Sequence, residues 1–289
     1  MVTTLSAEQI ARYKRDGYLS PLRIMSNDEA TRRRRRFEAL EASLGKGNDL
    51  PRPLRQYLRI NAHVVLGMAV ELARDPRILD AVEGVIGPNI LVWGCEFFVK
   101  EANTPNVVSW HQDLTYWGLG ETDHEVTAWL ALSPATSESG CMRFVAGSHQ
   151  SRIVRHNDTF ADDNLLSRGQ EIAVDVDEAD AVHAALQPGE MSLHHGRMFH
   201  ASGPNVSDDR RIGVAVRYLT TEVKQQVAAR DYAMHVRGVD RERNFIGLAG
   251  PARDFEPSAL ALYEQILKDQ SAALSEGAEQ NLEFYEVEA

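Results

Sequence analysis

The feature that most constrains the fold is a series of short segments, beginning at Ile90, that are rich in β-branched and aromatic residues. The first two segments are Ile90–Trp93 and Phe97–Lys100. The others are Glu125–Ser133, Met142–Ala146, Val182–Leu186, Glu190–His195 and Ile212–Leu219. Such residues favour strands, and the glycine, proline and asparagine residues between the segments favour turns. Many short strands joined by turns predict a β-sandwich or a barrel.

Helical patterns flank this β-rich region on both sides. Ser6 and Gln9 form a capping-box pattern ahead of a short helix that Gly17 ends. A second helix opens at Ser26 and stops before Gly45 and Gly47. Apolar residues at helical spacing predict further helices over Val64–Leu72, Arg77–Ile86 and Ser258–Leu274.

Composition and charge narrow the possible partners. A chain of 289 residues that is 43% hydrophobic and 25% charged has the composition of an ordinary globular protein, and we expect one domain. The net charge of −11 argues against broad binding to nucleic acid or to a membrane surface. We therefore interpret Arg32–Arg36 as a solvated helix face, offset by Glu38 and Glu41, and not as a nucleic-acid or targeting signal.

Three further features concern location and mobility. There are only two cysteines, Cys95 and Cys141, no signal-peptide pattern and no apolar run long enough to span a bilayer, so we expect a cytoplasmic protein with reduced thiols. Residues 147–170 are polar and longer than a plain connection, which predicts a functional loop or lid. The acidic C-terminal tail is expected to fray.

A candidate metal site begins in the segment Ser109–Trp117. If this segment is a strand, His111 and Asp113 leave the same face, because side chains two residues apart in a strand do so. A third ligand is needed, and His200 is the best candidate because it lies among small and turn-forming residues. Two histidines and one carboxylate with open coordination positions suit a non-haem Fe(II) oxygenase.

Arg211 adds an anion-binding group. It opens an apolar segment that begins at Ile212, and an arginine that enters the interior of a β-sandwich is costly unless an anion meets it. Its planar guanidinium suits a carboxylate bidentately. The sequence therefore predicts a carboxylate ligand near the metal.

Five elements in this order resemble the phytanoyl-CoA dioxygenase family of Fe(II)- and 2-oxoglutarate-dependent oxygenases, to which ectoine hydroxylase is also related. The elements are His111–Leu114, Trp129, Gly147–His149, His200–Gly203 and Arg211, and the resemblance covers roughly residues 57–219. The resemblance implies that His111, Asp113 and His200 bind iron. It also implies that Arg211 and Ser202 bind the distal carboxylate of 2-oxoglutarate, and that Trp129 lines that pocket.

The fold implied by the resemblance is mainly β with flanking helices, a double-stranded β-helix or jelly roll. We expect a single domain over residues 1–289, with a helical part to about residue 88, a jelly-roll core over about 89–220, and a C-terminal helical extension over 221–289. The implied reaction uses Fe(II), 2-oxoglutarate and O₂ to hydroxylate a small molecule with release of succinate and CO₂. Asp113 favours hydroxylation over halogenation, because halogenating relatives need Gly or Ala there. Desaturation and cyclisation by the same oxidant stay open.

Substrate residues are less well defined by the sequence. Tyr116 and Trp117 follow the metal-binding segment, and we expect them to wall the substrate pocket. Arg217 lies on the same side of its predicted strand as Gly213 and Ala215, which suggests an anionic substrate; the alternative is an arginine at a strand end that reaches solvent. No extensive basic surface favours a CoA thioester.

Alternatives exist for each site residue. His111 and Asp113 could be a hydrogen-bonded pair without a metal, Trp129 a core aromatic, Ser202 a turn residue, and Arg211 a surface partner of Asp208 or Asp209. His194 and His195 compete with His200 as third ligand, and we rank His195 as an outer partner of the site and His149 as structural. The chain could also be a non-catalytic metal- or 2-oxoglutarate-binding jelly roll or, less favoured, a zinc hydrolase. The sequence carries no signal for an oligomeric state.

Overall fold

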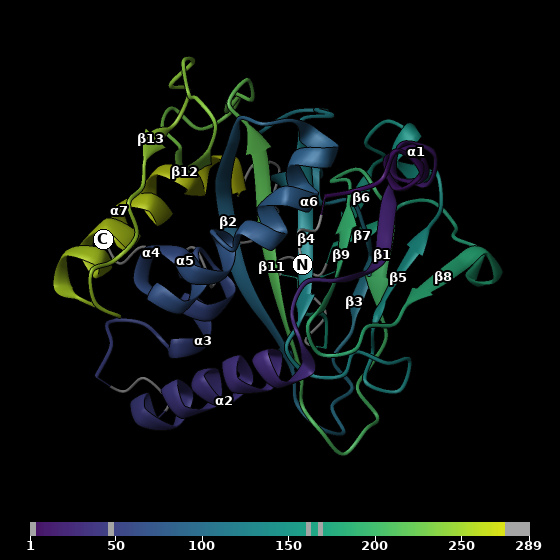
Figure 1. The fold of residues 1–289 in the computed structure, drawn as a ribbon, viewed down its shortest axis with the longest axis horizontal. Helices are drawn as coiled ribbons and strands as arrows, with labels where there is room; N and C mark the ends of the chain where they lie inside the picture. The colour runs from purple at the N-terminus through teal and green to yellow at the C-terminus, as the bar shows by residue number, and fades with distance from the viewer. Residues whose placement is uncertain (1–3, 46–48, 160–162, 167–169, 275–289) are drawn as a thin grey trace.

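The structure, a computed structural model, describes residues 4–45, 49–159, 163–166 and 170–274. Two β-sheets form its centre, and helices cover one side of the larger sheet (Figure 1). The larger sheet has seven strands in the order β1 (Tyr18–Arg23), β9 (Glu190–His194), β4 (Glu125–Ala131), β11 (Arg211–Thr220), β2 (Ile90–Lys100), β12 (Tyr232–Arg237) and β13 (Ile246–Gly247). Neighbouring strands run antiparallel except β12 and β13.

The smaller sheet packs against the inner face of the larger one. Its four antiparallel strands follow the order β3 (Val108–His111), β10 (His200–Ser202), β5 (Met142–Val145) and β8 (Ala181–Ala184). A separate pair is formed by β6 (His156–Asp158) and β7 (Gln170–Ile172). The arrangement confirms the predicted jelly roll with flanking helices.

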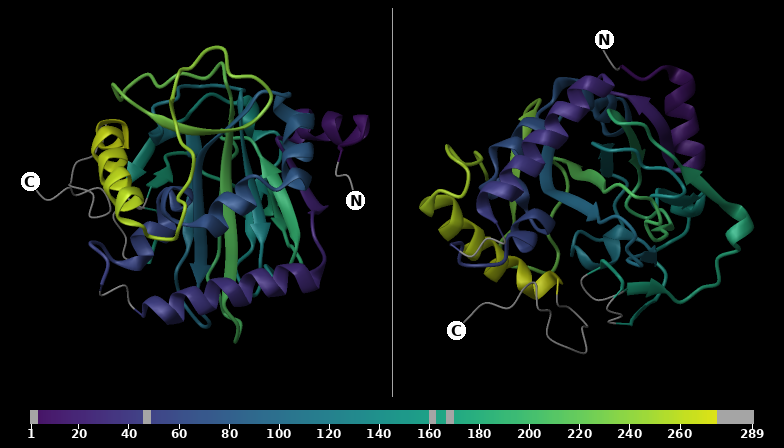
Figure 2. Two further views of the ribbon diagram at one scale, coloured as in Figure 1. Left: turned by 60° about the vertical axis from the view of Figure 1, so that its left-hand side comes forward. Right: turned by 90° about the horizontal axis from the view of Figure 1, so that it is seen from below.

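The helices lie mainly on the outer face of the large sheet (Figure 2). They are α1 (Ala7–Asp16), α2 (Asn27–Leu44), α3 (Leu54–Arg59), α4 (Ala62–Val65), α5 (Gly67–Ala73), α6 (Pro76–Ile86) and α7 (Pro257–Leu274). Aromatic pairs join them to each other and to the sheet: Phe37 of α2 stacks on Phe97 of β2 with ring centroids 4.7 Å apart, and Tyr57 of α3 contacts Tyr263 of α7 at 4.7 Å. The main hydrophobic core therefore lies between the helices and the sheet. The opposite face of the sheet carries smaller apolar clusters, such as the one with Trp129 and Ala215, together with polar residues.

The helix boundaries follow from local chemistry. The predicted capping box is present, because Ser6 accepts a hydrogen bond from the Gln9 amide while the Gln9 side chain accepts one from the Ser6 amide. Gly17 ends α1 with a φ of +80°, a conformation that L side chains rarely adopt. A side chain at Gly17 would also overlap Met198 and His149, so this glycine lets α1 pack close to the loop after β9.

Several predicted boundaries were wrong. The expected helix over Val64–Leu72 is two helices, because Leu66 adopts an extended conformation with φ −124° and ψ 118°. The segments Ile90–Trp93 and Phe97–Lys100 are one strand, β2, because Gly94 and the two residues after it pair with β11. Residues 1–88 and 221–289 are not purely helical, since β1 and β12 join the large sheet through backbone pairing that side-chain periodicity does not reveal.

Two predictions fall partly outside the described residues. The segment 147–170 contains a 3₁₀ turn over Ser148–Gln150 and the strand β6, but residues 160–162 and 167–169 lie outside the description, so its role as a lid stays a prediction. The acidic tail and Gly47 also lie outside it. Within the described part of the chain, no helix has the length and apolar character needed to cross a bilayer.

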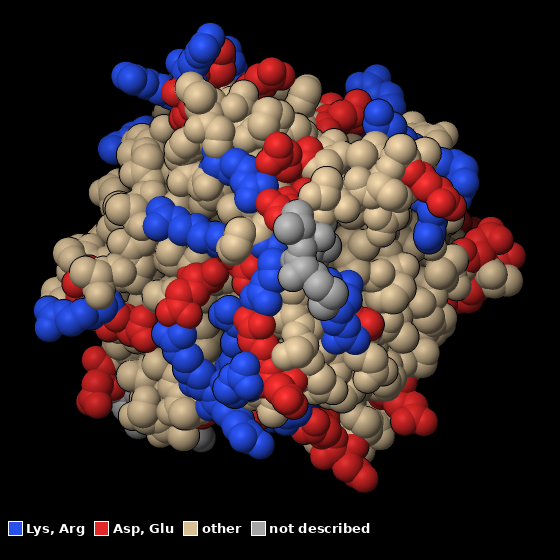
Figure 3. Space-filling model, viewed as in Figure 1, with Lys and Arg blue, Asp and Glu red and all other residues tan. Residues whose placement is uncertain are grey.

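The arginine run on α2 faces carboxylates. Arg34 pairs with Glu38 at 2.9 Å and with Asp209 at 2.6 Å, and Arg36 pairs with Glu71 at 2.6 Å. Glu41, predicted as another partner of the run, pairs with Arg210 instead. Blue and red side chains are interspersed on the face seen in Figure 3. These contacts support the interpretation of the run as a charged helix face that other acidic groups compensate.

Candidate metal centre

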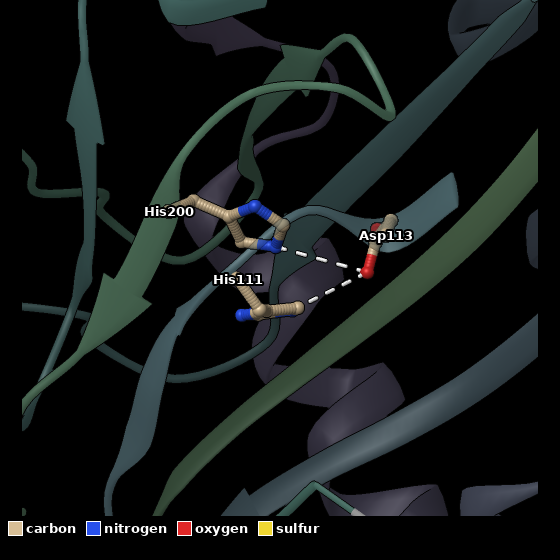
Figure 4. A group of neighbouring side chains, drawn as sticks. All are labelled: His111, Asp113 and His200. Atoms are coloured by element: carbon tan, nitrogen blue, oxygen red, sulfur yellow. Dashed lines mark ion pairs between the residues drawn. The ribbon is translucent and has the colours of Figure 1, made fainter. Parts of the chain in front are cut away.

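The three predicted metal ligands converge although they do not share a strand. The strand β3 ends at His111, and Asp113 begins a 3₁₀ helix (Asp113–Tyr116), so the expectation of one strand through Ser109–Trp117 was wrong. The turn at Gln112 brings the carboxylate back toward the imidazole. His200 lies opposite His111 in the pairing of β10 with β3. Figure 4 shows both imidazoles directed at one oxygen of Asp113.

The distances suit a single ion. Ligand atoms of His111, Asp113 and His200 all lie within 4.8 Å of one another. The Nε2 atoms of His111 and His200 lie 3.3 and 3.9 Å from Asp113 Oδ1. Among the residues that the structure describes, this is the group of histidine, cysteine and acidic side chains close enough to hold a metal.

Backbone carbonyls fix the protonation of both imidazoles. His111 Nδ1 lies 2.9 Å from the carbonyl oxygen of Ser109, and His200 Nδ1 lies 3.0 Å from that of Met198. A carbonyl can only accept, so each Nδ1 carries the proton and each Nε2 presents a lone pair. Two lone pairs and a carboxylate oxygen that point at one place repel one another unless a cation lies between them. The donor set therefore fits a divalent metal.

Burial sets the charges of this group. Burial lowers the pKa of His200 well below its usual value, which keeps the ring neutral and able to coordinate. Burial of Asp113 opposes its ionisation, but His200 and Arg217 outweigh that effect and hold its pKa well below the usual range. A neutral imidazole and an ionised carboxylate are the forms that ligate metals.

A cavity extends from the three ligands along the inner face of β11. Side chains on one face of this strand, Arg211, Ala215 and Arg217, line the cavity together with residues of the facing sheet. The residues that line the cavity are Phe98, Val108, His111, Asp113, Thr127, Trp129, Met142, Leu166, His194, His200, Ala201, Ser202, Arg211, Ala215 and Arg217.

Arg211, Trp129 and Ser202 meet at one end of this cavity, as predicted. The Arg211 guanidinium lies over the Trp129 ring at 5.2 Å and donates to the Gly140 carbonyl at 2.7 Å. Its Nε has no partner among the described residues. Gly213 is required here, because any side chain would overlap the Trp129 ring. The alternative of Arg211 as a surface partner of Asp208 or Asp209 is wrong, since Arg211 is only 1% exposed.

Lys100 adds a second buried cation beside Arg211 that the sequence reading missed. It is the partner of Arg211 in the pairing of β2 with β11, and its ammonium donates to Ser202 Oγ at 2.8 Å. No carboxylate of the described residues lies within ion-pair distance of either cation. Burial lowers the pKa of Lys100 to about 6 and that of Arg211 to about 10. Arg211 therefore stays charged near neutral pH and attracts an anion to this end of the cavity, whereas Lys100 is charged mainly when an anion lies nearby.

Arg217 marks the other end, close to Asp113. It forms an ion pair with Glu96 at 2.8 Å and lies over the Trp117 ring at 4.7 Å. Arg217 is buried, so the alternative of a strand-end arginine that reaches solvent is wrong. Tyr116 packs edge-on against His156, and neither it nor Trp117 is among the residues that line the cavity. Substrate contact by Tyr116, Trp117 and Arg217 stays a prediction.

Polar residues behind Asp113 were also missed by the sequence reading. Thr127 Oγ1 lies 3.4 Å from Asp113 Oδ2 and 3.0 Å from Glu125 Oε1. Burial, followed by the charge of Asp113, raises the pKa of Glu125 to about 8. Their signal in the sequence was charged or polar side chains on one face of an otherwise apolar strand. Glu125 and Thr127 are two positions apart, and Glu96 and Lys100 are four positions apart.

The neighbouring histidines, the last residue of β9 and the residue after it, point in different directions. His194 points inward, with its Nε2 3.8 Å from Asp113 Oδ2, and it lines the cavity. His195 points outward and contacts Asp123 at 3.2 Å, so ranking it as the outer partner of the site was wrong and His194 takes that place. His149 lies in a turn, as predicted, where its Nε2 contacts the Lys14 carbonyl at 3.2 Å.

Comparison with known proteins identifies the family to which the chain belongs. A sequence model of the phytanoyl-CoA dioxygenase (PhyH) family matches residues 13–213. The chain belongs to the phytanoyl-CoA dioxygenase family. As a member, it is a non-haem iron oxygenase that uses Fe(II), 2-oxoglutarate and O₂, which confirms the resemblance drawn from the motifs.

Similar proteins and similar structures extend this comparison. A probable alpha-ketoglutarate-dependent hypophosphite dioxygenase from Stutzerimonas stutzeri is 26% identical over 166 residues, which are 56% of this chain and 56% of that relative. The chain thus matches about half the length of that relative. The structure of the non-heme monooxygenase ThoJ in its apo form is 32% identical in sequence and has a TM-score of 0.82. The alignment covers 93% of this chain and 98% of the ThoJ chain. CytC3 with Fe(II) and alpha-ketoglutarate shares the fold at 24% identity and a TM-score of 0.67, over 89% and 97% of the two chains.

Proposed function

We propose that this protein hydroxylates a small-molecule metabolite, with His111, Asp113 and His200 as the ligands of Fe(II). The observation that carries the proposal is the convergence of two Nε2 lone pairs and one carboxylate oxygen, in the same cavity as a buried arginine that meets no carboxylate of the described residues. Fe(II) bound there would supply, with 2-oxoglutarate and O₂, the oxidation of a substrate C–H bond with release of succinate and CO₂.

The residues around the ligands have separate tasks in this proposal. His111 and His200 offer unprotonated Nε2 atoms because the Ser109 and Met198 carbonyls hold the protons on Nδ1. Asp113 supplies the negative charge and, unlike Gly or Ala, fills the position that halogenating relatives leave open. Its second oxygen lies near Thr127 and His194, which favours coordination through one oxygen only.

Arg211, Ser202 and Trp129 form the proposed site for 2-oxoglutarate. The distal carboxylate would neutralise the guanidinium of Arg211, which is buried at a cost that an anion offsets. Ser202 would add a hydrogen bond, and the Trp129 ring would cover the aliphatic part of the molecule and exclude water. The charge of Arg211 at this end matches the single negative charge of the distal carboxylate.

The end near Arg217 is the proposed substrate side. Because Glu96 already meets the charge of Arg217, this end does not require an anionic substrate group, and a neutral or zwitterionic molecule suits it equally. If an anionic substrate binds here, it must share Arg217 with Glu96. If Arg217→Ala binds the substrate as tightly as the wild-type enzyme does, Arg217 does not contact the substrate.

Anaerobic spectroscopy tests the proposed centre directly. Addition of Fe(II) and 2-oxoglutarate without O₂ should give a weak visible charge-transfer band, and succinate should form over a panel of metabolites once O₂ is admitted. Analysis of each product would separate hydroxylation from desaturation and cyclisation. A band without turnover would favour the non-catalytic 2-oxoglutarate-binding alternative. Zinc in the anaerobically purified protein, with no band, would favour the zinc hydrolase, although that function leaves Arg211 without a role.

We further propose a single domain, a cytoplasmic location and partners limited to small molecules. One hydrophobic core joins residues from Leu5 to Leu267, as expected of one folding unit. Cys95 and Cys141 are both buried free thiols, which suits a reducing compartment. Arg34 and Arg36 are paired with carboxylates, which argues against nucleic-acid binding by the arginine run.

A further inference from the structure

Glu125 is a fully buried carboxyl group on β4 that takes no part in the proposed metal or cosubstrate site. Arg217, a basic side chain that acts on it electrostatically, forms its ion pair with Glu96 instead. A buried carboxylate without a paired cation is costly, and burial together with the charge of Asp113 raises the pKa of Glu125 to about 8. The neutral acid carries an O–H group and can therefore donate a hydrogen bond.

The Thr127 hydroxyl group lies between this carboxyl group and the second oxygen of Asp113. Thr127 Oγ1 is 3.0 Å from Glu125 Oε1 and 3.4 Å from Asp113 Oδ2. A hydroxyl group has one proton, so it can donate to only one of the two carboxyl groups. When Glu125 donates to Thr127, the hydroxyl proton is available to Asp113, whereas an ionised Glu125 would accept that proton itself.

The strand register surrounds Thr127 with two other polar groups that act on Asp113. Thr127 pairs with His194 of β9 on one side and with Arg217 of β11 on the other. His194 Nε2 lies 3.8 Å from Asp113 Oδ2, and Arg217 acts on Asp113 through its charge. A hydroxyl proton rotates to suit its neighbours, so the direction of the central group in this row depends on Glu125.

We propose that Glu125 is a positioning residue for Asp113: as a neutral acid it donates to Thr127 and so turns the Thr127 hydroxyl toward Asp113 Oδ2. This inference rests on the proposed role of Asp113 as a ligand of Fe(II). The hydrogen bond from Thr127 holds the second oxygen and leaves Oδ1, the oxygen that faces His111 and His200, for the metal. Outer partners of this kind hold a carboxylate ligand in one orientation.

The test measures Co(II) binding to the full chain by titration of the visible Co(II) spectrum. Thr127→Val keeps the shape of the side chain and removes the hydroxyl group, and we expect the affinity to fall at least about tenfold. Thr127→Ser restores the hydroxyl group and should recover most of that loss. Glu125→Gln keeps a neutral donor and should bind Co(II) within about twofold of wild type, whereas loss of an ionised Glu125 would weaken the binding of a cation further.

A double-mutant cycle shows whether Glu125 acts through Thr127. Glu125→Leu removes the donor, and we expect Co(II) affinity to fall about threefold or more in the wild-type background, with no further loss in the Thr127→Val background. Glu222→Gln is the matched control, because Glu222 is exposed near His124, and it should leave Co(II) affinity unchanged.

Infrared spectroscopy reports the proton on Glu125 directly. The carbonyl band of protonated carboxyl groups should lose intensity in Glu125→Gln and keep its intensity in Glu222→Gln. Thermal unfolding shows which variants are folded. If Glu125→Leu does not fold, the infrared comparison and the two Thr127 variants still decide the proposal.

The outcomes distinguish this inference from the metal centre on which it rests. A wild-type protein that does not bind Co(II) overturns the proposed centre itself. A wild-type protein that binds Co(II), while Thr127→Val binds it equally tightly, overturns only the positioning role. An equal loss from Glu125→Leu in both backgrounds, or an infrared band that is unchanged in Glu125→Gln, also overturns that role and leaves the centre in place.

Discussion

His111 and His200 face each other across the pairing of β3 with β10, and their ring centroids are 4.0 Å apart. Residues far apart in the sequence thus become neighbours through the register of two short strands. A shift of one residue in that register would turn one imidazole to the opposite face of the smaller sheet. The candidate metal centre therefore depends on correct strand pairing as much as on the identity of its ligands.

Variants of three histidines should separate ligands from neighbours. In His200→Ala, affinity for Co(II) should fall by at least about 100-fold, because a direct ligand is lost, whereas His194→Gln should cost roughly tenfold, the scale of an outer partner. His195→Gln should bind Co(II) as wild type does, since His195, just after β9, contacts Asp123 and does not line the cavity. Titration followed by the visible Co(II) spectrum measures all three. Equal losses in His195→Gln and His200→Ala would contradict the assignment.

Gly213→Ala should weaken cosubstrate binding without affecting the metal ligands. The added methyl group would overlap the Trp129 ring, which must then move from its place over Arg211. We expect the KM for 2-oxoglutarate to rise about tenfold or more with little change in metal affinity. Gly247→Ala is the matched control, because nothing lies within 4 Å of the position of a side chain there. An unchanged KM in Gly213→Ala would mean that Trp129 does not cover the cosubstrate.

The ion pair of buried Arg217 with half-buried Glu96 should stabilise the fold as a unit. Glu96→Gln leaves the Arg217 charge buried without its partner, and we expect the free energy of unfolding to fall by about 3 kcal/mol or more. Replacement of both residues, Glu96→Gln with Arg217→Met, should cost less than Glu96→Gln alone. Urea denaturation of the two single variants and the double variant gives the coupling. A double variant whose loss equals the sum of the single losses would show that the ion pair contributes nothing.

His63 should make stability depend on pH in the acid range. Both its ring nitrogens are buried without partners among the described residues, and burial lowers its pKa to about 4. The unfolded chain binds a proton below about pH 6.5, while the folded chain does so only near pH 4, so stability is lost as pH falls through this window. The loss that His63 causes should reach about 3 kcal/mol.

His63→Leu should remove this part of the pH dependence, measured as the free energy of unfolding at pH 7 and pH 4. His235→Gln is the control, since His235 is exposed on β12. An identical pH dependence in wild type and His63→Leu would show that His63 already finds a proton acceptor or solvent in the folded protein.

The sequence was sufficient for the fold class and for the groups most specific in spacing. His111, Asp113, His200 and Arg211 could be placed in one candidate site because few residue types perform their chemistry and because their order matches a family. Lys100 and Glu96 could not be assigned in this way, since a charged residue in a strand points inward or outward according to register, which depends on the partner strand. Their positions become meaningful only once β2 is paired with β11.

The short edge strand β1 and the different directions of His194 and His195 were missed for a related reason. Tyr18–Arg23 contains a proline and has little alternation, so it gives no strand signal until β9 pairs with it. His194 and His195 are chemically identical, and only the face of the sheet that each occupies distinguishes a cavity residue from an outer one.

Both histidines of the candidate centre receive their orientation from a main-chain carbonyl two residues earlier, at Ser109 and at Met198. Every amino acid supplies such a carbonyl, so substitutions at those two positions leave the acceptor of the Nδ1 proton intact. Mutations that change the surrounding side chains can therefore accumulate while Nε2 stays the unprotonated nitrogen of both imidazole rings. This separation gives the scaffold freedom to acquire new substrates during evolution while its coordination chemistry stays constant.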